Sequence, residues 1–138
     1  MLVDAGPLIA IVDSKDPHHS ACVRTLESLV LPFYTTWPVL TEVSHFITRR
    51  GSEQNRRAFW RLVRRGAIVP HDLVTADIPR LETLMQAYAD RPMDLADASL
   101  VVLAERLENR RIFTLDTDFR VYRIGGRKHF EIVPIDTD

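Results

Sequence analysis

Apolar residues along this chain fall into two patterns, short continuous runs and repeats at helical spacing. Short apolar runs that end at polar residues, glycine or proline are typical of buried strands. They predict strands over residues 1–3, 33–36, 67–69, 112–115 and 130–135.

Between the runs, apolar residues recur every three or four positions, as on one face of an amphipathic helix. This spacing predicts helices over residues 8–12, from Asp16-Pro17 to about Val30, and over 38–50, 52–65, 76–89 and 94–107. The side chains predicted to face inwards from the helix at 76–89 are those of Ile78, Leu81, Leu84, Met85 and Tyr88. The helix at 94–107 is apolar almost all the way round, which is typical of a helix buried against a sheet.

Strands that alternate with helices indicate an α/β fold with a parallel sheet and right-handed crossovers. A length of 138 residues suits one such domain with a hydrophobic core, so we expect a single domain over 1–138. Ligands of such sheets bind beyond the carboxyl ends of the strands. Asp4 and Asp116 each follow a predicted strand and therefore become candidates for a site.

Composition narrows the class of protein. The formal net charge of −1 gives no overall positive field that would indicate a nucleic-acid partner. Cys22 is the only cysteine, which excludes an internal disulfide and a cysteine-based metal site and fits a cytoplasmic protein. We expect no signal peptide and no membrane span, because the first residues lack the pattern of a leader and no apolar run is long enough.

Acidic residues stand at four places, and each has an ordinary structural explanation. Asp4 suits a turn before Gly6-Pro7, and Asp94 suits the N-cap of the helix that follows it. Glu42 suits the first turns of its helix, where a negative charge interacts favourably with the helix dipole. Asp116 and Asp118 suit a polar turn after a strand.

Two of these carboxylates are harder to explain as surface residues. Glu42 is predicted on the same side of its helix as Val39 and Phe46. Asp97 shares a face with the apolar residues of the helix predicted to be buried. An ionised carboxylate in such a place needs a cation, a hydrogen-bond network or a metal, and Arg91 is the nearest candidate cation in the sequence.

Together the acids predict a metal site. Several carboxylates at one rim of the sheet would repel one another unless a cation neutralised them, and a set without His or Cys favours Mg²⁺ or Mn²⁺ over Zn²⁺. Such a metal lowers the pKa of a bound water and neutralises charge on phosphate oxygens, which suits hydrolysis of phosphodiesters.

In this order the acidic motifs resemble the PIN-domain family, and particularly the toxins of bacterial VapBC toxin–antitoxin pairs. The matching segments are Leu2-Val3-Asp4, Thr41-Glu42-Val43, Asp97-Ala98 within Met93 to Leu100, and Phe113 to Phe119. The resemblance implies a PIN-like three-layer α/β/α sandwich with a mostly parallel sheet, an endoribonuclease activity on RNA, an inhibiting antitoxin protein and a homodimer.

The resemblance also implies which residues form the site. The acids of the family map onto Asp4, Glu42, Asp97 and Asp116, with Asp118 as an alternative for the last place and Asp94 as an additional acid. We expect Asp4, Asp97 and Asp116 to hold the metal, with Asp94 and Asp118 as outer ligands, and Glu42 to orient or deprotonate the attacking water. Gly6 is a departure, because many relatives carry Ser or Thr two residues after the first Asp.

Two rival functions remain open at this point. One is a non-catalytic PIN-like module that binds RNA or a protein, although such a module has no need to concentrate carboxylates near phosphate. The other is a metal-dependent DNA nuclease or phosphatase, which would use the same acidic cluster. Only the family resemblance favours RNA over these substrates.

Basic and aromatic residues give weaker indications. One face of the helix at 52–65 carries arginines, namely Arg57, Arg61, Arg64 and Arg65. This face fits a solvated surface, with Glu53 paired to Arg57, or a track for RNA phosphates or an acidic antitoxin segment. Trp37 and Trp60 fit packing roles or stacking on bases, and the histidines lack the spacing of a metal site.

Overall fold

The strands form a five-stranded parallel sheet, in a computed structural model that describes residues 1–137. The order of strands is β3-β2-β1-β4-β7. Their bounds are β1 Leu2–Val3, β2 Phe33–Thr36, β3 Ile68–His71, β4 Arg111–Phe113 and β7 Glu131–Ile132. Leu2 of the central strand is in register with Tyr34 on one side and Ile112 on the other. The carboxyl ends of β1 and β4 therefore lie next to each other.

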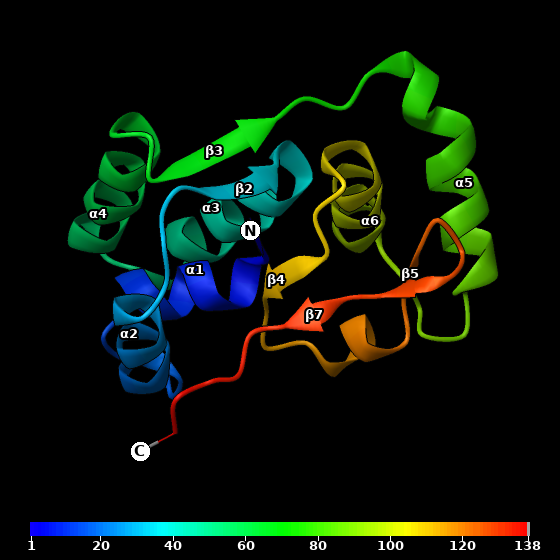
Figure 1. The fold of residues 1–138 in the computed structure, drawn as a ribbon. Coiled ribbons are helices and arrows are strands. Elements are labelled where there is room, and N and C mark those ends of the chain that lie inside the picture. The colour runs from blue at the N-terminus through cyan, green and yellow to red at the C-terminus, as the bar shows by residue number, and fades with distance from the viewer. Residues whose placement is uncertain (138) are drawn as a thin grey trace.

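Six α-helices connect the strands in the described part of the chain (Figure 1). Their bounds are α1 Ala5–Val12, α2 His19–Glu27, α3 Trp37–Arg50, α4 Glu53–Arg64, α5 Ile78–Ala87 and α6 Leu95–Leu107. Two short 3₁₀ turns, η1 Thr75–Asp77 and η2 Thr117–Arg120, complete the connections. Figure 1 shows α4 and α5 at opposite ends of the molecule, with the sheet and α6 between them.

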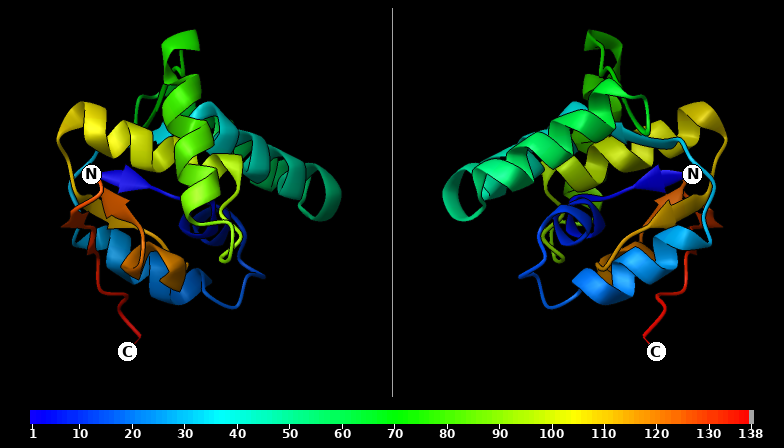
Figure 2. Two further views of the ribbon diagram at one scale, coloured as in Figure 1. Left: turned by 90° about the vertical axis from the view of Figure 1, so that its right-hand side faces the viewer. Right: turned by 90° about the vertical axis from the view of Figure 1, so that its left-hand side faces the viewer.

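The helices form layers on the two sides of the sheet, as right-handed crossovers require. Both views of Figure 2 show α6 on one side of the strands and α2 on the other. α6 packs against β2, α3 and α5, and α1 packs against α2, α3 and α4. The predicted α/β architecture, with a parallel sheet between layers of helices, is confirmed. Within residues 1–137, none of the helices is both long and apolar enough to cross a membrane.

α6 is the most deeply buried of the described helices, and its burial was predicted from the sequence. Its side chains from Ala98 to Ala104 are all buried, and they include the fully buried Leu100, Val101 and Ala104. Burying apolar surface contributes about 25 cal/mol per Å², so this helix supplies a large part of the stability of the core. The residues at its amino-terminal end are thereby held rigidly at one edge of the sheet.

Several local predictions were wrong, for identifiable reasons. α1 begins at Ala5 and not at Leu8, because the Asp4 side chain caps it and Pro7 lies in its first turn, where a missing N–H costs no hydrogen bond. Ile78 is the first residue of α5 and is 56% exposed. Val30 lies beyond the end of α2 and is 80% exposed.

A second, two-stranded sheet was not predicted from the sequence. β5 Arg123–Ile124 and β6 Lys128–His129 pair antiparallel and are joined through Gly125 and Gly126, both with positive φ. The two strands are only two residues each, too short for an alternating pattern to be recognised. Their hairpin packs against the end of α6.

Candidate active site

Asp4 stands at the point where β1 ends and α1 begins. Its extended backbone makes it the N-cap of α1, and its Oδ1 accepts a hydrogen bond from Ala5 N at 2.8 Å. Its Oδ2 accepts one from Thr114 Oγ1 at 2.9 Å. Burial raises the pKa of Asp4 above its usual value, and the charges of Asp116 and Asp94 act in the same direction. The two hydrogen bonds partly offset this effect because they stabilise the carboxylate.

Asp116 lies just beyond the end of β4, beside Asp4. Its backbone N–H donates to Thr114 Oγ1 at 3.0 Å, and its Oδ1 accepts from Asp118 N at 2.9 Å. The second bond makes Asp116 the N-cap of η2. Thr114 is thus a bridge between the two strand-end acids, since its hydroxyl contacts both residues.

Asp94 and Asp97 come from the amino-terminal end of α6. Asp94 is the N-cap, and its Oδ1 accepts from Asp97 N at 2.9 Å, so the capping role predicted for it is confirmed. Asp97 is half-buried, and its Oδ2 accepts a hydrogen bond from the Tyr122 hydroxyl at 3.0 Å. Burial and the Asp94 charge raise the pKa of Asp97 to about 7, although the Tyr122 hydrogen bond acts in the opposite direction.

Glu42 reaches the same place from α3. The residue is exposed overall, but its carboxyl group lines the acidic cavity. Desolvation of that carboxyl and the neighbouring Asp94 carboxylate raise the pKa of Glu42 to about 8, with smaller contributions from Asp4 and Asp97. Glu42 is therefore an exposed residue that nevertheless lines the acidic cavity.

Three of these acids converge closely enough to share one cation. One carboxylate oxygen from each of Asp4, Asp97 and Asp116 lies within 4.8 Å of the others. They line a cavity of about 320 Å³ together with Glu42 and Asp94. Gly6 also lines the cavity, and a Cβ there would lie 3.4 Å from the Leu115 side chain, so the helix comes close to the chain after β4.

Asp118 is placed differently from the other predicted acids. It does not belong to the group of three, and it forms an ion pair with Arg91 at 3.4 Å. The sequence suggested Arg91 as a possible partner of Asp97, whereas Asp97 is hydrogen-bonded by Tyr122. Of the two alternatives for the last acidic position, Asp116 is the residue that lies beside Asp4 and Asp97.

Two residues that contact the acids were missed by sequence reasoning. Thr114 has a recognisable signal, because it lies two residues before Asp116 at the end of an apolar run and so faces the same side. Tyr122 has no such signal, since it follows the 3₁₀ turn η2 and reaches Asp97 only through the tertiary fold. Burial and the Asp97 carboxylate raise the pKa of Tyr122, so its hydroxyl remains a donor.

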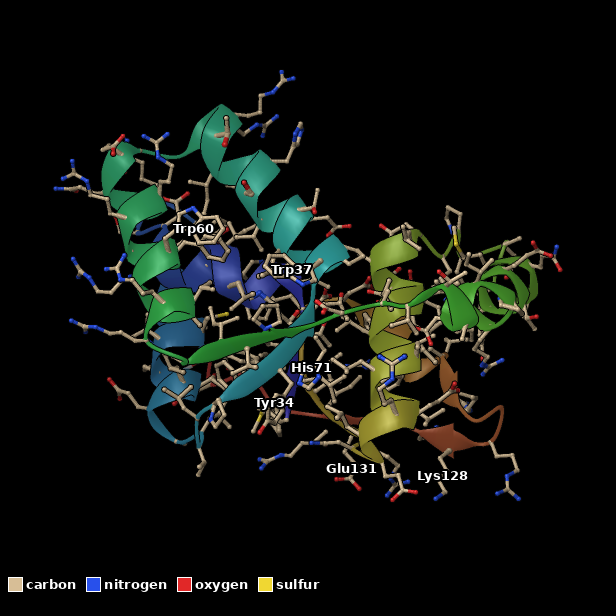
Figure 3. All side chains as sticks on the ribbon, turned by 90° about the horizontal axis from the view of Figure 1, so that it is seen from above. Tyr34, Trp37, Trp60, His71, Lys128 and Glu131 are labelled. Carbon is tan, nitrogen blue, oxygen red and sulfur yellow. The ribbon has the colours of Figure 1, made fainter. Side chains whose placement is uncertain are left out.

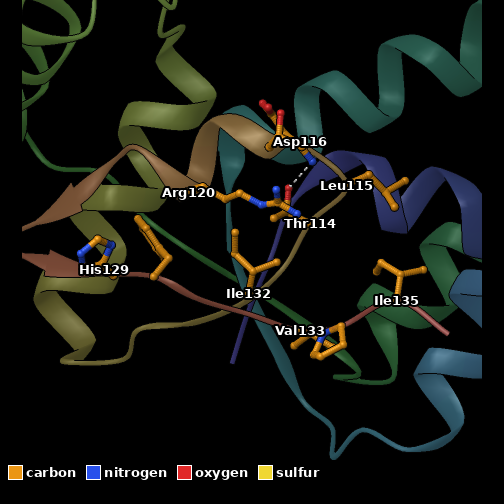
Figure 4. A pocket seen from close by; sticks show the side chains of 11 residues that line it. Thr114, Leu115, Asp116, Arg120, His129, Ile132, Val133 and Ile135 are labelled. Carbon is orange, nitrogen blue, oxygen red and sulfur yellow. Dashed lines mark hydrogen bonds between the residues drawn. The ribbon is translucent and has the colours of Figure 1, made fainter.

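A second cavity of about 610 Å³, shown in Figure 4, adjoins the site at Asp116. It shares Leu115 and Asp116 with the acidic cavity. Arg120 and His129 line it among apolar residues of the chain around β7. The acidic cavity is therefore continuous at Asp116 with a larger cavity beside β7.

The arginines of α4 and Trp60 do not line the acidic cavity. The predicted pairing of Arg57 with Glu53 is confirmed at 3.4 Å, and Arg56 also contacts Glu53. Figure 3 shows nitrogen-tipped side chains projecting from the outer side of α4, with Trp60 on that helix and Trp37 at the start of α3. His19 has a structural role, because its Nδ1 donates to the Ala10 carbonyl at 2.6 Å.

The donor set fits a hard divalent cation. Asp4, Asp97 and Asp116 offer oxygen atoms only, and burial, together with the neighbouring carboxylates, raises the pKa values of Asp4 and Asp97. Mg²⁺ and Mn²⁺ prefer such oxygen ligands and retain several waters, for which the open cavity leaves room. A bound cation would lower the free energy of this arrangement by neutralising the carboxylates.

Comparison with known proteins agrees with this fold. The sequence is 28% identical over 135 residues to Ribonuclease VapC26 of Mycobacterium tuberculosis, a match that covers 97% of this chain and all of that protein. The fold is similar to the crystal structure of VapC20, a Sarcin-Ricin loop cleaving toxin of the same species, with a TM-score of 0.78 and 16% identity over 87% of this chain and 92% of the other. The family model for the PIN domain matches residues 1–125. The chain belongs to the PIN-domain family.

Proposed function

We propose that this protein is a metal-dependent endoribonuclease of the VapC toxin type, which hydrolyses RNA phosphodiester bonds. The observation that carries the proposal is the convergence of Asp4, Asp97 and Asp116 on one point at the carboxyl edge of the sheet. The similarity to Ribonuclease VapC26 over the full length of that protein supports RNA as the substrate.

The proposed cofactor is Mg²⁺ or Mn²⁺, held by Asp4, Asp97 and Asp116 directly or through water. Asp94 would act as an outer ligand from the cap of α6, and Asp118 as a more distant one. When bound, such a cation lowers the pKa of a coordinated water and neutralises charge that develops on the phosphate.

The protein groups around the cluster have distinct tasks in this proposal. Glu42 orients or deprotonates the attacking water, because it lines the same cavity as the three acids that would hold the cation. Thr114 holds Asp4 in place, and Tyr122 holds Asp97. These hydrogen bonds fix the orientation of the ligands, an effect worth about 10- to 100-fold in metal affinity at comparable sites.

The proposed partners follow from the toxin assignment. An antitoxin protein would inhibit the enzyme by covering or entering the acidic cavity, and the enzyme would act in the cytoplasm as a homodimer. The exposed arginines of α4 are a candidate surface for an acidic antitoxin segment. A neighbouring small open reading frame in the genome would support this part of the proposal.

The experiment that tests the function compares substrates under defined metals. Structured and single-stranded RNAs, DNA of the same sequences and an aryl phosphate ester are incubated with wild type and Asp97→Asn, with Mg²⁺, Mn²⁺ or EDTA. We expect cleavage of RNA alone, abolished by EDTA and by the substitution. Cleavage of DNA or of the ester would favour the rival enzymes, and RNA binding without cleavage under any metal would favour the non-catalytic module.

A further inference from the structure

Trp37 is an exposed aromatic residue at the edge of the sheet where the acids converge. It is the first residue of α3 and follows β2 directly, so it lies at the carboxyl end of a strand adjacent to β1. The residue is 45% exposed. A tryptophan with nearly half of its surface exposed is not explained by packing in the core alone.

The indole is nevertheless held in one orientation. Its Nε1 donates a hydrogen bond to Asp72 Oδ1 at 2.7 Å. Arg106 of α6 fixes the segment that carries Asp72, because its Nη1 donates to the Asp72 carbonyl at 3.1 Å and its Nη2 donates to both Asp77 carboxylate oxygens. A ring fixed in this way loses little conformational freedom when a flat ligand stacks on it.

A cavity of about 450 Å³ lies against this indole and continues into the acidic site. Its lining residues are Trp37, Pro38, Thr41, Glu42, Asp94, Leu95 and Ala96. Glu42 and Asp94 also line the cavity of the metal cluster, so the two cavities share a wall. Leu95, at 47% exposure, gives the cavity a second apolar surface beside Trp37.

We propose that Trp37 and Leu95 form a stacking site for one unpaired base of the RNA, next to the phosphodiester that is cleaved. The inference rests on the proposed function and adds to it a contact with one base beside the cleaved bond. Bases of single-stranded nucleic acids stack on aromatic side chains with little dependence on sequence.

The charges of the cavity favour a base over a phosphate at this position. Glu42 and Asp94 would repel a phosphate that entered beside Trp37, whereas a neutral base meets an apolar surface there. The adjoining phosphate would lie over Asp4, Asp97 and Asp116, where a bound cation supplies positive charge. A base at Trp37 would therefore lie next to a phosphate at the metal site, as a base and its phosphate do in a nucleic-acid strand.

Trp60 provides a matched control for Trp37. It lies on α4 and is 43% exposed, and the centroid of its ring is 5.2 Å from that of Phe59. Trp60 does not line the acidic cavity or the cavity beside it. These are the two tryptophans of the chain, so replacing either leaves a single fluorescent reporter.

The first experiment measures binding of a single-stranded RNA in the Glu42→Gln background with Mg²⁺, where cleavage is expected to be slow. We expect Trp37→Ala to weaken the Kd about tenfold or more, Trp37→Phe to weaken it less, and Trp60→Ala to leave it unchanged. RNA should quench the fluorescence of Trp37 in Trp60→Phe and leave that of Trp60 in Trp37→Phe unaltered. With Glu42 restored, Trp37→Ala should raise KM more than it lowers kcat.

A set of substrates that each lack one base near the cut then locates the contact. One abasic position should weaken binding to wild type by the same factor as Trp37→Ala, and it should have no further effect on Trp37→Ala. Unchanged affinity of a folded Trp37→Ala would overturn the inference while leaving metal-dependent cleavage by wild type intact. A change of oligomeric state without a change in RNA affinity would also overturn it and assign Trp37 to an interface between copies of the chain.

Discussion

The Thr114 hydroxyl donates a buried hydrogen bond of 2.9 Å to Asp4 Oδ2, and so connects the end of β4 to the end of β1. The same hydroxyl accepts from the backbone N–H of Asp116 at 3.0 Å. The geometry of the acidic cluster therefore depends on a neutral side chain that cannot itself ionise at ordinary pH.

Replacing Thr114 by Val tests this dependence, because Val has the same shape without the hydroxyl. We expect Thr114→Val to weaken Mg²⁺ or Mn²⁺ binding about 10- to 100-fold and to lower the free energy of unfolding by about 1–3 kcal/mol. Thr114→Ser retains the hydroxyl and is the control. Metal titrations of Thr114→Val that match wild type would show that Asp4 needs no such support.

Asp116 and Asp118 offer a matched pair two residues apart. Asp116 lies within 4.8 Å of the Asp4 and Asp97 oxygens, whereas Asp118 pairs with Arg91. We expect Asp116→Asn to reduce kcat for RNA by a factor of about 100 or more, the scale of losing a metal ligand. Asp118→Asn should reduce it by less than about tenfold. The reverse order in a kinetic comparison would assign the last acidic position to Asp118.

Tyr122→Phe should change the ionisation of Asp97 without changing the shape of the core. The Tyr122 hydroxyl stabilises the ionised form of Asp97, so its loss should raise the Asp97 pKa further above about 7 in the metal-free protein. NMR titration of the Asp97 carboxyl measures this shift. Tyr88→Phe is the control, since it also removes one hydrogen bond, the one that the Tyr88 hydroxyl accepts from Arg123 N, and should leave Asp97 unaffected.

The raised pKa of Asp97 has a consequence for the stability of the metal-free protein. The folded state holds the Asp97 proton up to about pH 7, whereas the unfolded chain loses it near the ordinary value of 3.8. Between these values the folded state binds more protons, so the contribution of Asp97 to stability is complete below pH 3.8 and is lost as the pH rises through about 7. Asp97→Asn should remove this part of the pH dependence.

Denaturant unfolding in EDTA at pH 5 and pH 8 measures this effect. Between pH 5 and pH 8 the free energy of unfolding of wild type should fall more than that of Asp97→Asn. Added Mg²⁺ should restore the stability of wild type at pH 8. Glu82→Gln, at an exposed position of α5, should behave as wild type. Equal pH dependence of wild type and Asp97→Asn would mean that folding does not raise the pKa of Asp97.

Sequence patterns predicted the parts of the site that depend on local structure. Asp4 and Asp116 follow apolar runs, and the register of a parallel sheet brings adjacent strand ends together. Asp97 was singled out because its helix is apolar nearly all round. Thr114 could have been found from its place two residues before Asp116, whereas Tyr122 could not, because its hydrogen bond to Asp97 joins distant segments and has no signature in either one.

The errors in the fold have the same origin. Ile78 is apolar and at helical spacing, but the spacing does not say where a helix begins to contact its neighbour. The strands β5 and β6 form because the chain returns along α6, and two-residue strands are below the length at which alternation is informative. Local patterns therefore predicted the helices and the strands of the main sheet, whereas tertiary contacts decide where these elements end and whether the shortest strands form.

The central claim is that the cluster of Asp4, Asp97 and Asp116 holds the metal that is needed for cleavage of RNA. Its most direct test measures Mn²⁺ binding by calorimetry and RNA cleavage on the same preparations of wild type, Asp97→Asn and Glu82→Gln. We predict that Asp97→Asn loses binding and cleavage together while remaining folded, and that Glu82→Gln retains both. RNA cleavage by Asp97→Asn at the wild-type rate, or by wild type in EDTA, would contradict the claim.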